Sequence, residues 1–324
     1  MSSLLEVRGL AVEYRASEGP VRAVDDLAFG IGRGETVAIV GESGSGKSTT
    51  ALALLRLLPD PPGRIVAGEI VFAGRDLARL PDGELRDVRG RDVAMIFQDP
   101  LAALNPIQMV GTQMVEMLRR HRKVSSAAAE RQAIEMLGLV GMPTPQRIFA
   151  RYPHQLSGGM RQRAMIGIAL MCHPQLLIAD EPTSALDVTV QAQVLDLLAS
   201  LKQRLGMALL LITHDLAVVA EIADRVVVMY AGRKVEEGPV RSVFTAPLHP
   251  YTGALLDASR IELSAEGYLA ELPEPAPAAH SGVGCSFAPR CPSAVAKCRV
   301  LVPPLEELAP GRKVACIRAE ESVR

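Results

Sequence analysis

The chain has 324 residues, of which 48% are hydrophobic, and its formal net charge is −1 at pH 7. No apolar run reaches the length of about 18 residues that a membrane span needs, and a nearly neutral chain is not expected to bind nucleic acid through bulk electrostatics. The first residues lack the basic and then apolar pattern of a secretion signal. We therefore expect a cytoplasmic protein whose association with a membrane comes through a partner.

Strands and turns are predicted for the first 85 residues, together with one helix. Residues 5–14 alternate loosely, as in a strand, and residues 36–40 form a short apolar run rich in β-branched side chains. A glycine-rich loop follows at 41–46. A helix is then predicted over 47–58, because two prolines close it off.

The middle of the chain alternates between strand and helix patterns. A helical pattern runs over 106–139, with methionines at helical spacing that we assign to core packing rather than to a cofactor site. Strands are predicted at 176–179, 208–213 and 225–230, and a helix at 189–205. This alternation is typical of an α/β fold with a largely parallel sheet.

The composition changes near residue 247, beyond which recurrent prolines interrupt any long helix. We place a domain boundary near residue 260 and interpret 271–279 as a stiff linker. Four of the five cysteines crowd the last forty residues. In a reducing cytosol, such a cluster indicates a metal site more often than a disulfide framework. The fifth, Cys172, is expected to be a small buried residue.

Residues 41–49 match the phosphate-loop pattern G-x-x-x-x-G-K-[ST] between a predicted strand and a predicted helix. The glycines let backbone N–H groups close around phosphate, while Lys47 reaches the β- and γ-phosphate oxygens and the Ser48 hydroxyl can bind Mg²⁺. A plain glycine-rich turn is a weak alternative in this context. The predicted nucleotide-binding residues of the loop are Gly41, Ser43, Gly44, Ser45, Gly46, Lys47, Ser48 and Thr49.

The apolar strand at 176–179 ends in two acids, Asp180 and Glu181. Asp180 is placed to hold Mg²⁺ through water, and Glu181 to orient or deprotonate an attacking water. Two solvated acids at a strand end would be the alternative interpretation. Beside a phosphate loop, the catalytic interpretation is favoured.

A second glycine-rich turn, Leu156-Ser157-Gly158-Gly159-Met160, begins 109 residues after Lys47. It is predicted to open a helix, so its N–H groups and the helix dipole would face a second anion. Two phosphate-binding turns this far apart can serve different nucleotides or different subunits. The spacing therefore predicts an ATPase that works as a head-to-tail pair.

Together these motifs resemble the ATP-binding subunit of ABC transporters, and the resemblance covers about residues 5–255. By this resemblance, Tyr14 stacks on adenine, and Gln98 senses Mg²⁺ and the γ-phosphate and faces the membrane partner. His214 is implied to contact the γ-phosphate. Ser157, Gly158 and Gly159 are implied to clasp the ATP held by the opposite subunit, and Ser184-Ala185-Leu186-Asp187 to lie across the dimer interface. Met160 departs from the commoner glutamine, but the phosphate contacts come from the three residues before it.

Three further stretches resemble the oligopeptide/dipeptide importers of this family. They are the extension of the Gln98 loop up to Pro106, the segment His249-Pro250-Tyr251-Thr252, and the cysteine-containing tail. Nickel and glutathione importers resemble the same branch. The resemblance therefore implies an ATPase for peptide import, with nickel or glutathione as the alternative cargo.

The four tail cysteines follow the spacing C-x5-C-x6-C-x17-C, which lacks the C-x2-C pair typical of structural zinc. Four thiolates suit a [4Fe–4S] cluster or Zn²⁺, and some relatives with a similar tail bind an iron–sulfur cluster. The alternative is a reduced loop whose cysteines simply pack. His280 is a further possible ligand, although a solvated histidine is the simpler interpretation. The candidate ligands are Cys285, Cys291, Cys298 and Cys316.

We thus expect an α/β phosphate-loop ABC ATPase with an antiparallel β subdomain and a small Cys/Pro-rich extension. The expected ATPase domain is 1–260, with a helical subdomain at about 100–160, and the extension is 261–324. The resemblance implies a second and different ATPase, two membrane permease subunits and an external binding protein. Two rivals are a soluble ABC ATPase acting on DNA or ribosomes, and a non-catalytic regulatory module. The single phosphate loop disfavours the first, and intact Lys47, Glu181 and His214 disfavour the second.

Overall fold

The computed structural model describes residues 3–17, 19–184, 186–259 and 283–319. The chain divides into two compact units, which are described separately. The first unit comprises Met1–Gly32, Thr36–Arg79 and Ile212–Arg324, and the second comprises Arg33–Glu35 and Leu80–Leu211. The predicted linker at 271–279 and His280 lie outside the described residues.

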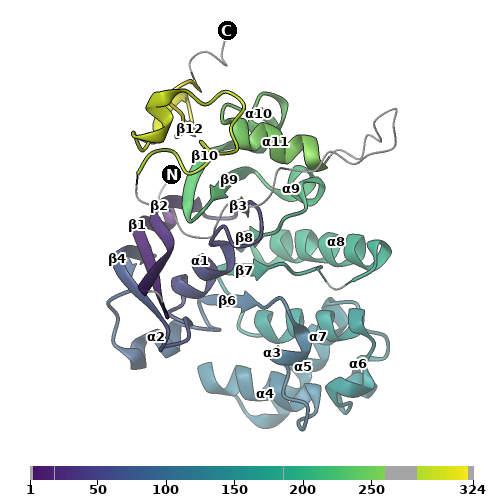
Figure 1. Ribbon diagram of the computed structural model, residues 1–324. Coiled ribbons are helices and arrows are strands. Elements are labelled where there is room, and N and C mark those ends of the chain that lie inside the picture. Colours follow the sequence, from purple (N-terminus) through teal and green to yellow (C-terminus); the bar gives the residue numbers. More distant parts are fainter. Residues whose placement is uncertain (1–2, 18, 185, 260–282, 320–324) are drawn as a thin grey trace. The chain divides into compact units, whose positions relative to one another are not determined.

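An antiparallel sheet of four strands begins the first unit, in the order β2-β1-β4-β5 (Figure 1). Its strands are β1 (Ser3–Ala16), β2 (Gly19–Gly32), β4 (Gly63–Phe72) and β5 (Arg75–Asp76). Val12 pairs with Val24 on β2, and Val7 pairs with Ile70 on β4. All four side chains are at most 1% exposed, so β-branched residues form the buried face of this sheet.

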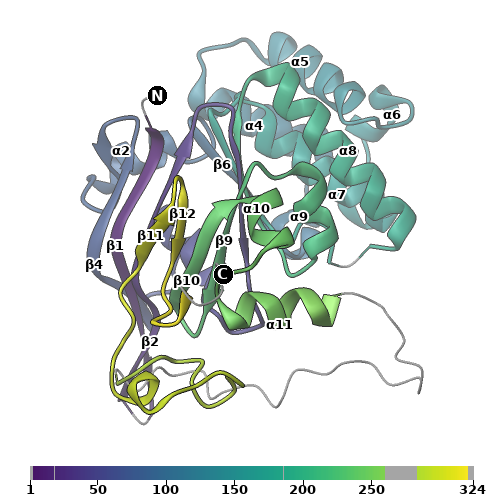
Figure 2. The ribbon, with the colours of Figure 1, turned by 90° about the horizontal axis from the view of Figure 1, so that it is seen from above.

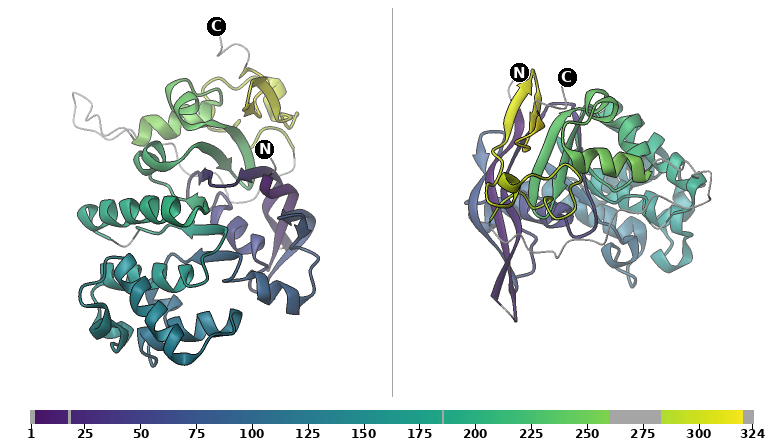
Figure 3. Two further views of the ribbon diagram at one scale, coloured as in Figure 1. Left: turned by 180° about the vertical axis from the view of Figure 1, so that it is seen from behind. Right: turned by 45° about the horizontal axis from the view of Figure 1, so that its top comes forward.

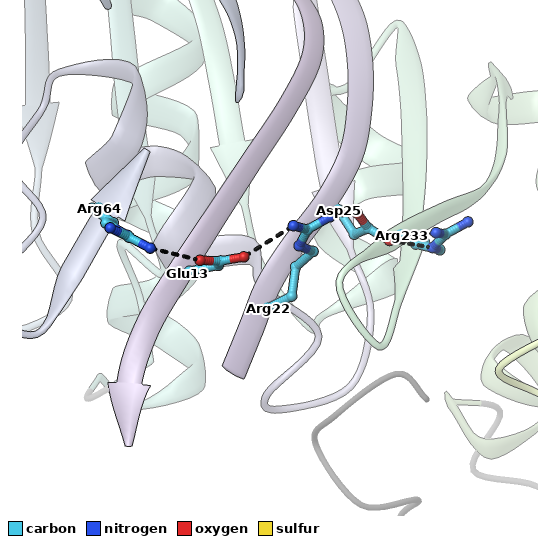
Figure 4. Close-up of polar contacts among 5 residues, drawn as sticks. All are labelled: Glu13, Arg22, Asp25, Arg64 and Arg233. Carbon is cyan, nitrogen blue, oxygen red and sulfur yellow. Dashed lines mark hydrogen bonds and ion pairs between the residues drawn. The ribbon is translucent and has the colours of Figure 1, made fainter. Parts of the chain in front are cut away.

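A chain of ion pairs connects three strands of this sheet to the strand β10 (Arg233–Pro239) (Figure 4). The Glu13 carboxylate accepts hydrogen bonds from Arg22 at 2.9 Å and Arg64 at 3.3 Å, and Asp25 accepts one from Arg22 at 3.0 Å and others from Arg233. Burial alone would raise the pKa of Asp25, but the two arginines outweigh it and lower that pKa. These ion pairs are expected to contribute little to stability, since the arginine side chains stay partly exposed.

A second sheet in the first unit has the order β11-β12-β10-β9-β3. Strand β3 (Thr36–Val40) pairs in parallel with β9 (Arg225–Tyr230), whereas β9, β10 and β12 pair antiparallel. The hairpin of β11 (Glu306–Ala309) and β12 (Arg312–Val314) comes from the tail and lies beside β10 (Figure 2). The helices of this unit are α1 (Lys47–Leu54), α9 (Leu216–Ile222), α10 (Val240–Thr245), α11 (Pro250–Ser259) and the one-turn η2 (Ala296–Arg299).

The second unit combines the strands β6 (Val93–Ile96), β7 (Leu176–Asp180) and β8 (Ala208–Ile212) with most of the helices. Strands β6 and β7 are parallel, and the strand order is β8-β7-β6. Blue to teal helices gather into one bundle beside this part of the sheet (Figure 3). The bundle comprises α3 (Pro100–Ala103), α4 (Val110–His121), α5 (Ser126–Leu139), α6 (Pro145–Phe149) and α7 (Gly158–Leu170). The other helices of this unit are α2 (Asp82–Val88), η1 (Pro153–Gln155) and α8 (Val188–Leu205).

Most predicted elements are confirmed, and two helix predictions need correction. The single helical pattern at 106–139 is two helices, because Ser125 caps a new helix by accepting a hydrogen bond from the Ala128 N–H at 3.3 Å. The helix that begins at Lys47 ends at Leu54, four residues before the predicted end. The buried position predicted for Cys172 is confirmed, since it is 2% exposed.

Candidate active site

The phosphate loop connects β3 to α1 and contains two glycines at which a larger residue would strain the backbone. Gly41 and Gly46 have φ angles of 152° and 97°, in the region that favours glycine. A Cβ at Gly41 would lie 2.2 Å from the Met229 carbonyl oxygen, and one at Gly46 would lie 2.4 Å from that of Ala23. The neighbouring strands therefore press against the loop and fix its path.

Lys47 lies at the start of α1 and is 6% exposed. Its ammonium donates hydrogen bonds to the carbonyl oxygens of Gly41 at 2.7 Å and Glu42 at 2.9 Å, so its charge lies inside the loop. The buried Ser45 hydroxyl has no hydrogen-bond partner within the described part of the chain. A buried hydroxyl without a partner, in the same loop as a buried ammonium, suits a site for phosphate oxygens.

Tyr14 and His214 belong to the same unit as the loop. The Tyr14 hydroxyl lies 3.5 Å from the Thr49 Oγ1, which brings the aromatic ring to the first turn of α1. His214 is exposed directly after β8, where the Thr213 N–H donates to the Ile39 carbonyl of β3 at 3.3 Å. The first unit thus gathers the phosphate loop, the predicted adenine-stacking ring and the predicted γ-phosphate histidine.

Gln98, Asp180 and Glu181 come together in the second unit. The parallel pairing of Ile96 with Ala179 places the ends of β6 and β7 side by side. The Gln98 amide donates a hydrogen bond to the Glu181 carboxylate at 3.0 Å. Glu181 has a φ of 45°, a left-handed conformation whose strain is common at functional sites.

The predicted signature turn opens α7. Ser157 is the N-cap residue, and its hydroxyl accepts a hydrogen bond from the Met160 N–H at 3.4 Å. Gly158 and Gly159 form the first turn, and Ser157 and Gly158 are exposed. The exposed N-terminal N–H groups of α7 can therefore bind an anion that approaches from solvent or from another chain.

Gln162, in the second turn of α7, was not predicted from the sequence. It is 2% exposed, and its amide donates to the Pro182 carbonyl at 2.6 Å. Pro182 follows Glu181 directly, so this hydrogen bond connects α7 to the segment just after β7. A polar residue on a buried helix face would have been the only sequence signal for it.

The four tail cysteines line one small cavity in the first unit, together with His249 and Phe287. Its volume of about 20 Å³ suits roughly one water molecule. Burial raises the pKa of Cys285 and of Cys316, so these groups are thiols at neutral pH. Within the described residues, no group of three or more Cys, His, Asp or Glu side chains is arranged to hold one metal ion. The donor chemistry therefore fits a metal centre, whereas the present spacing and volume do not.

Among the described residues, no helix is both long and apolar enough to cross a membrane. A family model described as ABC transporter matches residues 24–184, and one described as oligopeptide/dipeptide transporter, C-terminal region, matches residues 235–298.

The chain is 50% identical to the probable peptide ABC transporter ATP-binding protein y4tR of Sinorhizobium fredii, over 99% of the chain and 96% of that protein. It is 49% identical to the oligopeptide transport ATP-binding protein OppD of Escherichia coli, over 99% and 95% of the two chains. For the dipeptide transport protein DppD of Escherichia coli, the identity is 48% over 97% and 96%. A dimeric post-hydrolysis structure of the ATP-binding cassette MJ0796 with ADP and Pi aligns with a TM-score of 0.66 and 27% identity, over 73% of this chain and 99% of that one.

The chain is an ABC ATPase with the α/β fold of that family. Within that class, it belongs to the ATP-binding proteins of the oligopeptide/dipeptide branch of ABC transporters.

Proposed function

We propose that the chain powers the import of oligopeptides or dipeptides across the cytoplasmic membrane by hydrolysing ATP. The sequence similarity to two ATP-binding proteins of peptide transport carries this proposal, because it extends over nearly the whole chain and includes the tail as well as the ATPase core. Peptides themselves are selected by other chains, so the contribution of this chain is the ATPase cycle.

In the proposed cycle, the loop at 41–49 binds the ATP phosphates, with Lys47 against the β- and γ-phosphate oxygens and Tyr14 against adenine. Ser48, Gln98 and Asp180 would hold Mg²⁺, which neutralises phosphate charge when bound. Glu181 orients or deprotonates the attacking water, and the hydrogen bond from Gln98 holds its carboxylate in place. His214 contacts the γ-phosphate.

Two exposed parts of the second unit, the turn that opens α7 and a group of apolar side chains, support the proposed partners. Ser157, Gly158 and Gly159 would complete the ATP site of a second, different ATPase in a head-to-tail dimer. Exposed apolar side chains lie near Gln98 in the second unit, and we assign them to a membrane permease subunit. These side chains are Phe97, Leu101, Ile107 and Met109. An external binding protein delivers cargo, and this subunit lies on the cytoplasmic face of the membrane.

We assign residues 1–260 to the ATPase domain, with a helical subdomain at about 100–160, and residues 261–324 to the peptide-importer extension. The extension is proposed to hold a [4Fe–4S] cluster, on the strength of four thiols around one cavity. Binding of a cluster would require the residues around the cavity to rearrange, because its volume is about 20 Å³. Iron and acid-labile sulfide in anaerobically purified protein would support it, and protein without iron would contradict it.

The proposed function is tested in the complete transporter by Glu181→Gln. Since general-base catalysis contributes about 100-fold or more, ATP turnover and ATP-driven peptide uptake should both fall at least 100-fold while ATP binding persists. Glu130→Gln, which changes an exposed glutamate on α5, is the matched control. Retained turnover would contradict the role of Glu181, and normal turnover without peptide uptake would contradict the cargo.

A further inference from the structure

Glu42, the second residue of the phosphate loop, is held by an arginine from the tail. The Arg290 guanidinium donates two hydrogen bonds to the Glu42 carboxylate, from Nη1 at 2.9 Å and from Nη2 at 3.1 Å. The Arg290 side chain is 6% exposed and that of Glu42 is 23% exposed. Both residues belong to the first unit, although 248 positions separate them. Such a two-point contact fixes orientation as well as charge.

The backbone of Glu42 is held as well. Its N–H donates a hydrogen bond to the Tyr251 hydroxyl at 2.8 Å, and its carbonyl accepts one from the Lys47 ammonium at 2.9 Å. Tyr251 is 0% exposed on α11, beyond the last strand of the ATPase core. Two residues that follow the core in sequence therefore contact Glu42: Arg290 binds its side chain, and Tyr251 binds its backbone N–H.

Aromatic rings hold the arginine in position. The Arg290 guanidinium carbon lies 5.7 Å from the centre of the Tyr230 ring and 5.9 Å from that of Phe287. The Phe287 ring meets those of Tyr230 and Tyr251 edge to face, at 5.3 Å and 5.4 Å. The hydrogen bonds to Glu42 raise the pKa of Arg290, so the guanidinium keeps its charge. The rings and the carboxylate together hold the guanidinium in one orientation.

The turn that carries Arg290 also carries two of the four tail cysteines. The Ala288 N–H donates to the Cys285 carbonyl at 3.0 Å, and the Arg290 N–H donates to the Phe287 carbonyl at 3.0 Å. The cysteines at 285 and 291 line the small cavity on the same turn. The packing of the tail around that cavity therefore sets where Arg290 lies.

We propose that Arg290, supported by Tyr251, is a positioning residue for ATP binding, and that the cysteine-containing tail is part of the nucleotide site. Without Arg290, the Glu42 carboxylate would stand unpaired within a loop that receives a polyphosphate anion. Charge repulsion and a loosened loop would both weaken ATP binding. The inference rests on the proposed role of the loop at 41–49 as the ATP phosphate site.

The test measures equilibrium binding of a fluorescent ATP analogue with Mg²⁺ to the full chain, and ATP turnover in the assembled transporter. Arg290→Ala should raise Kd and KM about tenfold, equivalent to about 1.4 kcal/mol, with kcat at saturating ATP close to that of the wild type. The Kd and KM of Arg290→Lys should lie between those of the wild type and of Arg290→Ala, because an ammonium restores the charge without the two-point contact. Arg299→Ala, at an exposed arginine of the same tail, is the matched control.

The decisive variant is the double change Glu42→Gln with Arg290→Ala. Removing the carboxylate removes the repulsion, so Kd should return to within about threefold of the wild type. An unchanged Kd in Arg290→Ala would overturn the proposal. A raised Kd in Arg290→Ala that stays raised in the double variant with Glu42→Gln would also overturn it. Lys47→Ala separates the two levels of inference, since normal binding by that variant would contradict the loop assignment itself.

Discussion

Lowering the pH should destabilise this protein through one buried histidine. His249 is 2% exposed, and its Nδ1 accepts a hydrogen bond from the Tyr251 N–H at 3.0 Å, which requires the neutral ring. Burial lowers the pKa of His249 to about 4. An unfolded chain would titrate the same group near its ordinary value of about 6.5. Between these values the unfolded state binds a proton that the native state excludes, so stability is complete above pH 6.5 and falls as the pH drops toward 4.

The gap between about 6.5 and about 4 corresponds to a ceiling of about 3.4 kcal/mol, at 1.36 kcal/mol per pH unit. Between pH 7.5 and pH 5.5, the linkage relation gives a loss of about 1.3 kcal/mol from this group alone. Since one kcal/mol is a large share of the free energy of unfolding of a typical domain, the loss is measurable.

The assay is urea unfolding at pH 7.5 and 5.5 for the wild type and for His249→Asn, whose amide oxygen can accept the Tyr251 N–H without titrating. The variant should be less stable at pH 7.5, but its loss between the two pH values should be about 1.3 kcal/mol smaller. Other titrating groups cancel in this difference, and iron and zinc are assayed in both proteins so that metal content is matched. Equal losses in the two proteins would refute the burial of a neutral His249.

Two further predictions concern a buried carboxylate and the signature turn. Glu236 is 0% exposed and accepts hydrogen bonds from the backbone N–H groups of Leu248 and His249 and from Arg312. Arg312→Met leaves that charge without its cation and should lower the free energy of unfolding by about 3 kcal/mol, whereas the neighbouring Lys313→Met should have little effect; similar urea midpoints for both variants would contradict this. Ser157→Gly should cost only a few tenths of a kcal/mol as a helix-cap change and should leave ATP binding by the isolated chain intact. It should nevertheless reduce ATP turnover by the assembled transporter at least tenfold, a loss expected from removing one transition-state contact, and unchanged turnover would contradict a role across the dimer.

Local patterns in the sequence were enough to predict the strands and the helix start that carry the candidate site residues. The strand at 36–40, the loop after it and the two acids at the end of β7 each follow from a short run of residues whose preferences agree. The Gln98–Glu181 contact could have been inferred as well, because parallel strands bring their carboxyl ends to one edge. The break between α4 and α5 could be predicted from Ser125, a residue type that favours helix N-caps, but not from the hydrophobic period alone.

The long-range contacts could not be predicted from any local pattern. Gln162 reaches a carbonyl 20 positions away, and Arg290 reaches Glu42 across 248 positions. Nothing in the sequence near either residue specifies its partner, because the chain path between them decides which groups meet. The spacing of the cysteines likewise predicted a metal site or a packed loop, but could not indicate the small volume that the four side chains enclose.

The pairing of Glu42 with Arg290 has a consequence for how such subunits diverge and how they can be recombined. If the acid at position 42 depends on the base at position 290, the two positions should be inherited as a pair. A chimera that takes its tail from a relative with a neutral residue in place of Arg290 should need the loop of the same donor. The tail could then be exchanged between relatives only together with the phosphate loop that it contacts.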